Sequence, residues 1–278
     1  MPAELPISVL LLARDETRDL EELLPALAFA REVVMVWDPR GDPATRATAE
    51  RLGARVFEHP FEGFGAQRQF ALERCTQDWV LWIDADERLA PGALERLTHG
   101  IVVPDERVPG VLPVYWGVYL RRESFFLGTR IRHCGWGDER VFRLFRRRCS
   151  RFDDALVHEA VRFVPPEERV GPAPPIEPRW PLTHVTRAVL EHHSYRTLAD
   201  CETKLVRYGE ANAEKAFRAG RRAGPLDVAL RPTLRFLRQY VLQRGFLDGR
   251  AGLLLCLYAA RQVRLKYARL AALSKGAS

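Results

Sequence analysis

Strand-like and helix-like segments alternate through the first hundred residues of this 278-residue chain. Short apolar runs rich in β-forming residues are separated by segments whose apolar residues recur at helical spacing. The expected strands cover residues 7–13, 33–37, 55–58 and 79–83, and the expected helices cover 20–30, 44–52 and 66–74. This order predicts an α/β fold in which helices cover both faces of a mostly parallel sheet.

Charged side chains follow three of the expected strands. Arg14, Asp15 and Glu16 come after the first strand, Asp38 after the second, and the run 84–87 after the last. In open α/β sheets, ligands bind beyond the carboxyl ends of the strands. These residues, far apart in sequence, are therefore expected to form one cluster in space.

The central motif is Asp84-Ala85-Asp86, at the end of an apolar strand. Carboxylate oxygens in such a place suit Mg²⁺ or Mn²⁺, which usually complete their coordination with substrate phosphates and water. Acidic pairs at strand ends are also common as caps and turns, and the triplet alone favours that structural role.

Four further residues are candidates for ligand contacts at the same edge. Asp38 is placed to accept hydrogen bonds from a base or a ribose, although a capping or turn role is an equal alternative. Arg14, Gln67 and Arg68 are suited to contact phosphate or an acceptor anion, and Arg offers planar, bidentate donors. Each of these three, taken alone, is more often a solvated surface residue.

The chain becomes helical and basic towards its C-terminus, where helices are expected at 198–219, 226–243 and 253–273. Residues 201–278 contain 16 Lys and Arg against 5 Asp and Glu, whereas residues 1–200 contain 27 against 31. This asymmetry predicts an anionic partner, either phospholipid headgroups or nucleic acid. Helices that mix apolar residues with Arg can lie in a membrane interface, and the alternative is a helical lid with a solvated basic face.

Cysteine usage and hydropathy indicate the compartment. The five cysteines are scattered and contain no Cys-x-x-Cys pair, which fits a reducing environment rather than a disulfide framework. The N-terminus lacks the pattern of a signal peptide, and no apolar run is long enough to span a bilayer.

Several motifs together resemble family 2 glycosyltransferases, and more closely the branch that contains the lipopolysaccharide core glucosyltransferases. The motifs are Arg14-Asp15-Glu16 after the first strand, the stretch 63–72, Asp84-Ala85-Asp86-Glu87, the stretch 142–147, Val157-His158-Glu159, the stretch 192–196, and the stretch 245–249 with Gly252. The resemblance runs from about residue 5 to about residue 270, and the later motifs are more specific than Asp-x-Asp.

The resemblance implies a GT-A fold, which is a Rossmann-like domain, and an inverting, metal-dependent transfer of a hexose from a nucleotide-sugar. A UDP-sugar, with glucose as the hexose, is the implied donor, and a lipid-linked envelope glycan such as a lipopolysaccharide core is the implied acceptor. We expect a glycosyltransferase domain at 1–197, an amphipathic helical extension at 198–278, and a peripheral position at the cytoplasmic face of the inner membrane.

The family also implies roles for individual residues. Asp38 corresponds to the nucleoside ligand, and Asp86, with Asp84 nearby, to the residue that holds the metal and the diphosphate. An inverting transfer needs a carboxylate to accept the proton of the acceptor hydroxyl. Spacing from the stretch 142–147 favours Glu139 as this base and leaves Asp138 open.

Two histidines lie within the matched motifs. His158 and His192 are suited to complete a metal shell, orient a phosphate or bind in the acceptor pocket, and a structural role is equally frequent for a histidine of this kind.

Other functions remain as alternatives. Transfer to a polyprenyl phosphate uses the same domain but usually adds membrane spans. A non-enzymatic module that binds nucleic acid or an anionic surface is prompted by the sequence pI of about 9.4, but no nucleic-acid-binding motif is present, and we expect no nucleic-acid partner. The chain also departs from the family after Asp38, where Pro39-Arg40-Gly41-Asp42 replaces a Gly-Ser-Thr-Asp turn. The base and sugar of the donor are therefore left open.

Overall fold

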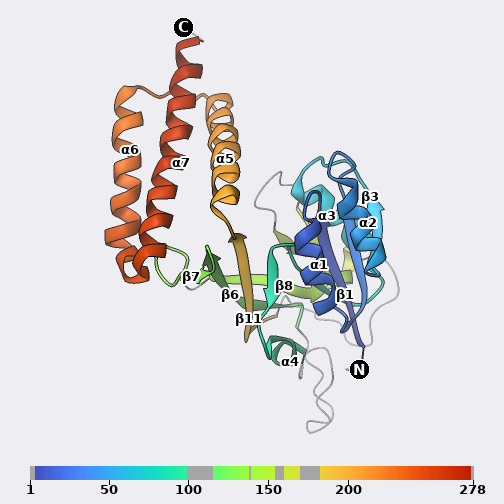
Figure 1. Cartoon of the computed structure of the whole chain (residues 1–278). Coiled ribbons are helices and arrows are strands. Elements are labelled where there is room, and N and C mark those ends of the chain that lie inside the picture. The colour runs from blue at the N-terminus through green and yellow to red at the C-terminus, as the bar shows by residue number, and fades with distance from the viewer. Residues whose placement is uncertain (1–3, 99–114, 138, 154–159, 170–181, 277–278) are drawn as a thin grey trace. The chain divides into compact units, whose positions relative to one another are not determined.

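The computed structural model describes residues 4–98, 115–137, 139–153, 160–169 and 182–276. The chain divides into two compact units (Figure 1). The first comprises Met1–Arg122 and Arg140–Glu191, and the second comprises Glu123–Glu139 and His192–Ser278.

The first unit is built on a mixed sheet with the strand order β3-β2-β1-β4-β8-β6-β11-β5. The strands are β1 (Leu5–Ala13), β2 (Ala30–Trp37), β3 (Arg55–Glu58), β4 (Trp79–Trp82), β5 (Glu87–Leu89), β6 (Gly117–Phe126), β8 (Glu139–Arg146) and β11 (Thr183–Tyr195). The first four strands are mutually parallel, and β8 runs antiparallel to β4. A separate antiparallel pair joins β9 (Ser150–Phe152) to β10 (Val161–Phe163).

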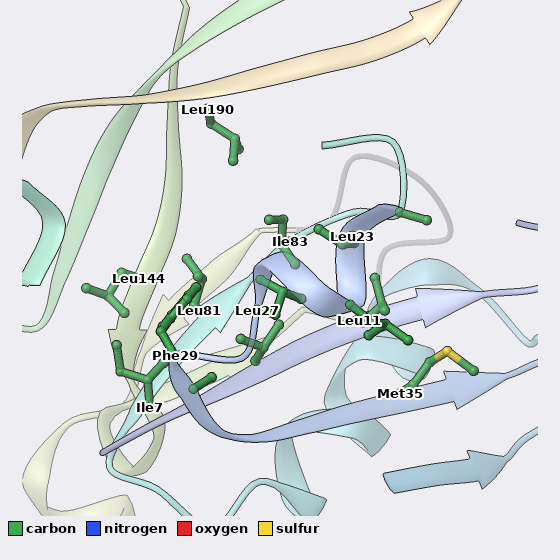
Figure 2. Packing of buried hydrophobic residues seen from close by; sticks show 14 of the residues in the cluster. Ile7, Leu11, Leu23, Leu27, Phe29, Met35, Leu81, Ile83, Leu144 and Leu190 are labelled. Carbon is green, nitrogen blue, oxygen red and sulfur yellow. The ribbon is translucent and has the colours of Figure 1, made fainter. Parts of the chain in front are cut away.

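Helices cover both faces of the parallel strands. They are α1 (Thr17–Ala26), α2 (Pro43–Arg51), α3 (Phe64–Arg74) and α4 (Ala93–Thr98), with short 3₁₀ turns η1 (Arg147–Cys149) and η2 (Pro166–Glu168). Alternate side chains of β1 enter two different cores: Val9 and Leu11 pack with α1, and Leu10 packs with α3. Figure 2 shows the first of these cores, in which Leu23 and Leu27 lie over Leu11 and Leu81. The predicted α/β fold is thus confirmed, with a mixed sheet in which β1 to β4 pair in parallel and β8 pairs antiparallel with β4.

The first helix ends earlier than its apolar spacing predicts. Helix α1 stops at Ala26 rather than continuing to residue 30, and the next strand begins at Ala30. Leu27 nevertheless remains in the core at 2% exposure, because a tight turn in which its amide donates to Leu24 O keeps it on the buried side. The apolar pattern therefore marks the buried face correctly but not the end of the helix.

The second unit contains the predicted C-terminal helices. They are α5 (Leu198–Arg218), α6 (Pro225–Leu237), the π-helical turn η3 (Arg238–Leu242), the 3₁₀ turn η4 (Gly245–Asp248) and α7 (Gly249–Gly276). Helix α7 packs against both α5 and α6 (Figure 1). Helix α5 begins with a capping box, in which Thr197 Oγ1 accepts from Asp200 N and Asp200 Oδ2 accepts from Thr197 N.

The second unit also includes a segment that the sequence assigned to the catalytic domain. Residues 123–139 contain the end of β6, the short strand β7 (Thr129–Arg130) and a loop, and they group with the helices. Phe126, Ile131 and Cys134 share a core with Leu255 and Cys256 of α7. This division of the chain differs from the predicted boundary after residue 197.

Asp248 connects this loop to the start of α7. Its carboxylate accepts from the backbone N of Arg132 at 3.1 Å and of His133 at 2.9 Å, and it lies 3.0 Å from His133 Nδ1. The surrounding glycines are required by close packing: a Cβ on Gly245 would lie 2.7 Å from Cys134 Sγ, and one on Gly252 would lie 2.1 Å from Gly245 O. The motif at 245–252 therefore has a structural role, which is to hold the loop at 132–134 against the start of α7.

Within the described parts of the chain, every helix is too short or too polar to cross a membrane.

Candidate functional site

The carboxyl ends of the four parallel strands bring the predicted residues of the first unit to one edge of the sheet. The register pairs Ala13 with Trp37, Trp37 with Glu58, and Leu10 with Trp82. The loops that leave β1, β2, β3 and β4 therefore lie side by side, and they carry Arg14, Asp38, His59 and Asp84 respectively.

The loops after β1 and β2 are held together by hydrogen bonds between side chains and the main chain. Trp37 Nε1 donates to Arg14 O at 3.2 Å, and Asp42 N donates to Asp15 Oδ1 at 2.8 Å. Gly41 is needed here, because a Cβ would lie 2.3 Å from Arg14 O. Glu16 Oε2 accepts from the backbone N of both Arg14 and Asp15, so this carboxylate shapes the loop that carries Arg14.

Asp38 is buried to 4% exposure, and both of its carboxylate oxygens are occupied by Arg40. Arg40 Nε donates to Oδ1 at 2.9 Å and Nη2 donates to Oδ2 at 2.8 Å, while Nη2 also reaches Phe61 O at 3.0 Å. The hydrogen bonds from Arg40 lower the pKa of Asp38 despite its burial. An ion pair between Asp38 and Arg40 thus stands in this turn, where the sequence departs from the family pattern.

Gln67 is buried and holds the loop after β3. Its Nε2 donates to His59 O at 2.8 Å and its Oε1 lies 2.8 Å from His59 Nδ1. Gln67 therefore fixes the start of α3, which places its neighbour Arg68.

Arg68 and Arg143 hold Asp84 from two sides. Arg68 Nη2 donates to Asp84 Oδ1 at 2.8 Å, and Arg143 Nη2 donates to Oδ2 at 2.9 Å. Both guanidiniums stack on Trp82, with their Cζ atoms 4.2 and 4.0 Å from the ring centre, and Trp82 Nε1 donates to Asp84 Oδ1 at 3.1 Å. We call Arg68, Trp82, Asp84, Glu87 and Arg143 the strand-end cluster.

Glu87 completes this cluster from the interior. It is fully buried, accepts from Arg143 Nη2 at 2.6 Å on Oε1, and accepts from Asp84 N at 3.0 Å on Oε2. Burial acts to raise the pKa of Asp84, but the guanidiniums of Arg143 and Arg68 outweigh it and hold this pKa well below its ordinary value. Glu87 and Asp84 likewise raise the pKa of Arg143 against the effect of burial. These shifts favour the ionised forms of both Asp84 and Arg143 at neutral pH.

Two carboxylates at this edge, Asp84 and Asp86, are the candidates for holding a divalent cation. Asp84 accepts from two guanidiniums, and the half-buried Asp86 lies on the turn directly after the strand. Within the described residues, His, Cys, Asp and Glu side chains form no group of three or more suited to hold an ion. A divalent cation at Asp86 would therefore need further oxygen ligands from substrate phosphates and water, as Mg²⁺ commonly does. Asp84 would support such a site indirectly, through its hydrogen bonds with the arginines.

The structure describes only part of the predicted catalytic and histidine set. Asp138 and His158 lie outside the described residues. Glu139 is exposed and begins β8, and it belongs to the second unit. His192 lies near the end of β11, also in the second unit, with Nε2 at 2.5 Å from Ser194 Oγ.

Three residues of this site were not predicted individually from the sequence: Arg40, Glu87 and Arg143. Arg143 could have been predicted, because an arginine within the apolar run 141–145 requires a buried acidic partner. The sequence indicates Arg40 more weakly, since an arginine two residues after a candidate carboxylate can fold back and pair with it.

Fold and site together define an α/β protein of the class that binds its ligand beyond the carboxyl ends of parallel strands. A sequence profile of glycosyl transferase family 2 matches residues 8–148, half of the chain, so the chain belongs to glycosyltransferase family 2.

Curated relatives extend the similarity to nearly the whole chain. The lipopolysaccharide core biosynthesis glycosyltransferase LpsC of Rhizobium meliloti is 26% identical over 280 residues, which cover 96% of this chain and 95% of LpsC. An uncharacterized glycosyltransferase of Rickettsia typhi, RT0209, is 21% identical over 96% of this chain and 87% of its own length. The resemblance to the lipopolysaccharide core branch is thereby confirmed.

Among solved structures, S. aureus TarS in complex with UDP-GlcNAc aligns with a TM-score of 0.34 and 18% identity. The alignment covers 43% of this chain and 35% of that one.

Proposed function

We propose that this glycosyltransferase transfers a hexose, glucose in the first instance, from a UDP-sugar to a lipid-linked envelope glycan such as a lipopolysaccharide core, with inversion at the anomeric carbon. The observation that carries the proposal is the strand-end cluster, which holds Asp84 between two arginines two residues before Asp86. The similarity to LpsC over nearly the full length of both chains supports the acceptor class.

In this proposal the first unit binds the donor. Asp86, with Asp84 beside it, would hold a divalent Mg²⁺ or Mn²⁺ ion, which would supply neutralising charge to the diphosphate. Arg68 and Arg14 offer positive charge close to the same edge, and Asp38 is the candidate ligand of the nucleoside. Glu16 and Gln67 act by fixing the loops that present these residues.

Transfer itself requires a base for the acceptor hydroxyl. Glu139 is our first candidate, with Asp138 as the alternative, and the carboxylate would accept the proton as the oxygen attacks the anomeric carbon. His158 and His192 are proposed to bind on the acceptor side. A lipid-linked acceptor would place the enzyme at the cytoplasmic face of the inner membrane, as a peripheral protein.

Calorimetric titration with UDP and UDP-sugars, with and without Mn²⁺, tests the donor site. Metal-dependent binding should be lost in Asp86→Ala and retained in the control Glu21→Ala. The control removes an exposed carboxylate of α1 that pairs with Arg51 of α2. Binding that is unchanged in Asp86→Ala would contradict the assignment. Ranking the UDP-sugars by affinity would identify the hexose, and the anomeric configuration of the product would test inversion.

A further inference from the structure

Helix α6 has an apolar face that its own fold does not use. Leu226, Leu230, Leu234, Leu237 and Val241 recur at intervals of four, four, three and four residues, so they lie on one side of α6 and its continuation η3. Their exposed fractions are 74%, 56%, 62%, 47% and 50%. We call these five residues the leucine face.

The contact between α6 and α7 is made by other side chains. Phe236 and Tyr240 stack on each other with ring centres 5.1 Å apart, and they pack against the core that contains Leu255 and Cys256 of α7. The leucine face is therefore not the side that holds α6 in the unit. An exposed apolar stripe of this length requires a partner to explain it.

Basic side chains flank this face. Arg231, Arg235 and Arg238 each follow a leucine of the face by one residue, so they share the adjacent side of the helix, and all three are exposed. Arg244 and Arg250 follow in the turn and at the start of α7, and both are exposed.

The acidic residues nearby do not neutralise this charge. Residues 225–257 contain only two acids, Asp227 and Asp248. Asp227 pairs with Arg231 at 2.6 Å, and Asp248 is buried at the joint with residues 132–134. Asp227 offsets the charge of Arg231 only, so the other four arginines leave a net positive charge beside the leucines. Two copies of this surface would repel each other, whereas an anionic surface would attract it.

We propose that the leucine face docks in the plane of an anionic phospholipid bilayer, with leucine side chains inserted below the headgroups and the arginines at the phosphates. Helices with an apolar side and a basic flank bind membranes in this manner. The inference rests on the proposed function in one respect: a lipid-linked acceptor would lie in that same bilayer.

Vesicle co-sedimentation of the full chain tests this docking without nucleotide or acceptor, so it can fail while donor binding persists. The chain should sediment with phosphatidylcholine vesicles that contain phosphatidylglycerol, and less with phosphatidylcholine alone. The double variant Leu230→Gln/Leu234→Gln should weaken binding at least about tenfold, since it removes two inserted apolar side chains. The matched control Val206→Gln, an exposed residue at 47% on α5, should bind as the unmodified chain does.

A charge variant provides a second measurement. Arg235→Gln/Arg238→Gln should weaken binding to the anionic vesicles by about fivefold per arginine and reduce the sensitivity of binding to salt. Arg218→Gln, which removes an exposed charge from α5, is its control.

Absence of sedimentation with anionic vesicles would overturn the proposal, as would equal binding by the leucine variant and its control. A stable dimer in solution that the leucine variant dissociates would also overturn it, in favour of a second copy of the chain as the partner of this face.

Discussion

Arg40 donates to both carboxylate oxygens of Asp38, at 2.9 and 2.8 Å, and so occupies the side chain that we propose as the ligand of the nucleoside. A nucleoside that uses this carboxylate must either displace Arg40 or bind to the pair as it stands. The two possibilities predict opposite effects when Arg40 is removed.

We expect Arg40→Ala to tighten UDP binding modestly, by about fivefold, because the nucleoside would no longer compete with the exposed guanidinium of Arg40 for the buried carboxylate of Asp38. Calorimetry with UDP measures the effect, and Arg46→Ala on α2, which removes a half-buried arginine paired with Glu50 and Glu58, is the control. Weaker binding in Arg40→Ala would show instead that the guanidinium itself contacts the nucleotide.

Glu139→Gln should lower kcat by about 10²- to 10⁴-fold and leave UDP affinity unchanged, because a general base acts in the transfer step rather than in donor binding. The comparison with Asp138→Asn separates the two candidates, since only the variant of the true base should show the full loss. Equal, small losses in both would exclude this pair as the source of the base.

Asp84→Asn should destabilise the fold by about 3 kcal/mol at neutral pH, because it removes the carboxylate that neutralises two buried guanidiniums. Urea unfolding measures this free energy. Asp86→Asn is the comparison, and it should affect metal-dependent binding far more than the free energy of unfolding. A large loss of stability in Asp86→Asn would remove the distinction between the two aspartates.

The stability that Asp84 provides should also depend on pH. The folded state holds the pKa of Asp84 below its unfolded value, so the unfolded chain takes up this proton first as the pH falls. The contribution is therefore fully present above about pH 4 and is lost as the pH falls through the folded pKa. Urea unfolding at a series of pH values should show the gap between Asp84→Asn and the unmodified chain narrowing in acid. A difference in the free energy of unfolding that stays constant with pH would contradict the lowered pKa of Asp84 in the folded state.

Asp248→Ala should reduce the free energy of unfolding by about 1–3 kcal/mol, because two backbone N–H groups at residues 132 and 133 lose their acceptor. Activity should fall further than stability explains, since Glu139 lies a few residues beyond this loop, while UDP binding should persist. Urea unfolding and initial rates measure the two effects, with Glu210→Ala on the exposed side of α5 as the control. An unaltered rate would separate the loop from catalysis.

Sequence patterns predicted the α/β unit well because each of its strands and helices is determined by residues that are close together in the sequence. Alternation along β1 sends Val9 and Leu10 to opposite cores, and the predicted strand 55–58 matches β3. Parallel strands then necessarily bring Asp38 and Asp84 to one edge.

The side chains that pair with these carboxylates could not be predicted in the same way. Arg143 and Asp84 are separated by 59 positions and meet only because β8 pairs with β4. The same holds for Asp248, whose contacts with residues 132–134 join segments more than 110 positions apart. Periodicity carries no information about such long-range pairs, and the glycines at 245 and 252 indicate only that some close approach occurs.

Segment 123–139 lies in the middle of the sequence but packs with the C-terminal helices, and Asp248 fastens it there. A chimera that takes its C-terminal helices from a relative through one cut near residue 197 should therefore fail. Its segment 123–139 would have to pack against helices from another protein. A transferable module needs two inserts with junctions near residues 122, 140 and 191, and compensating changes among homologues should link 132–134 with 245–252 rather than follow the order of the chain.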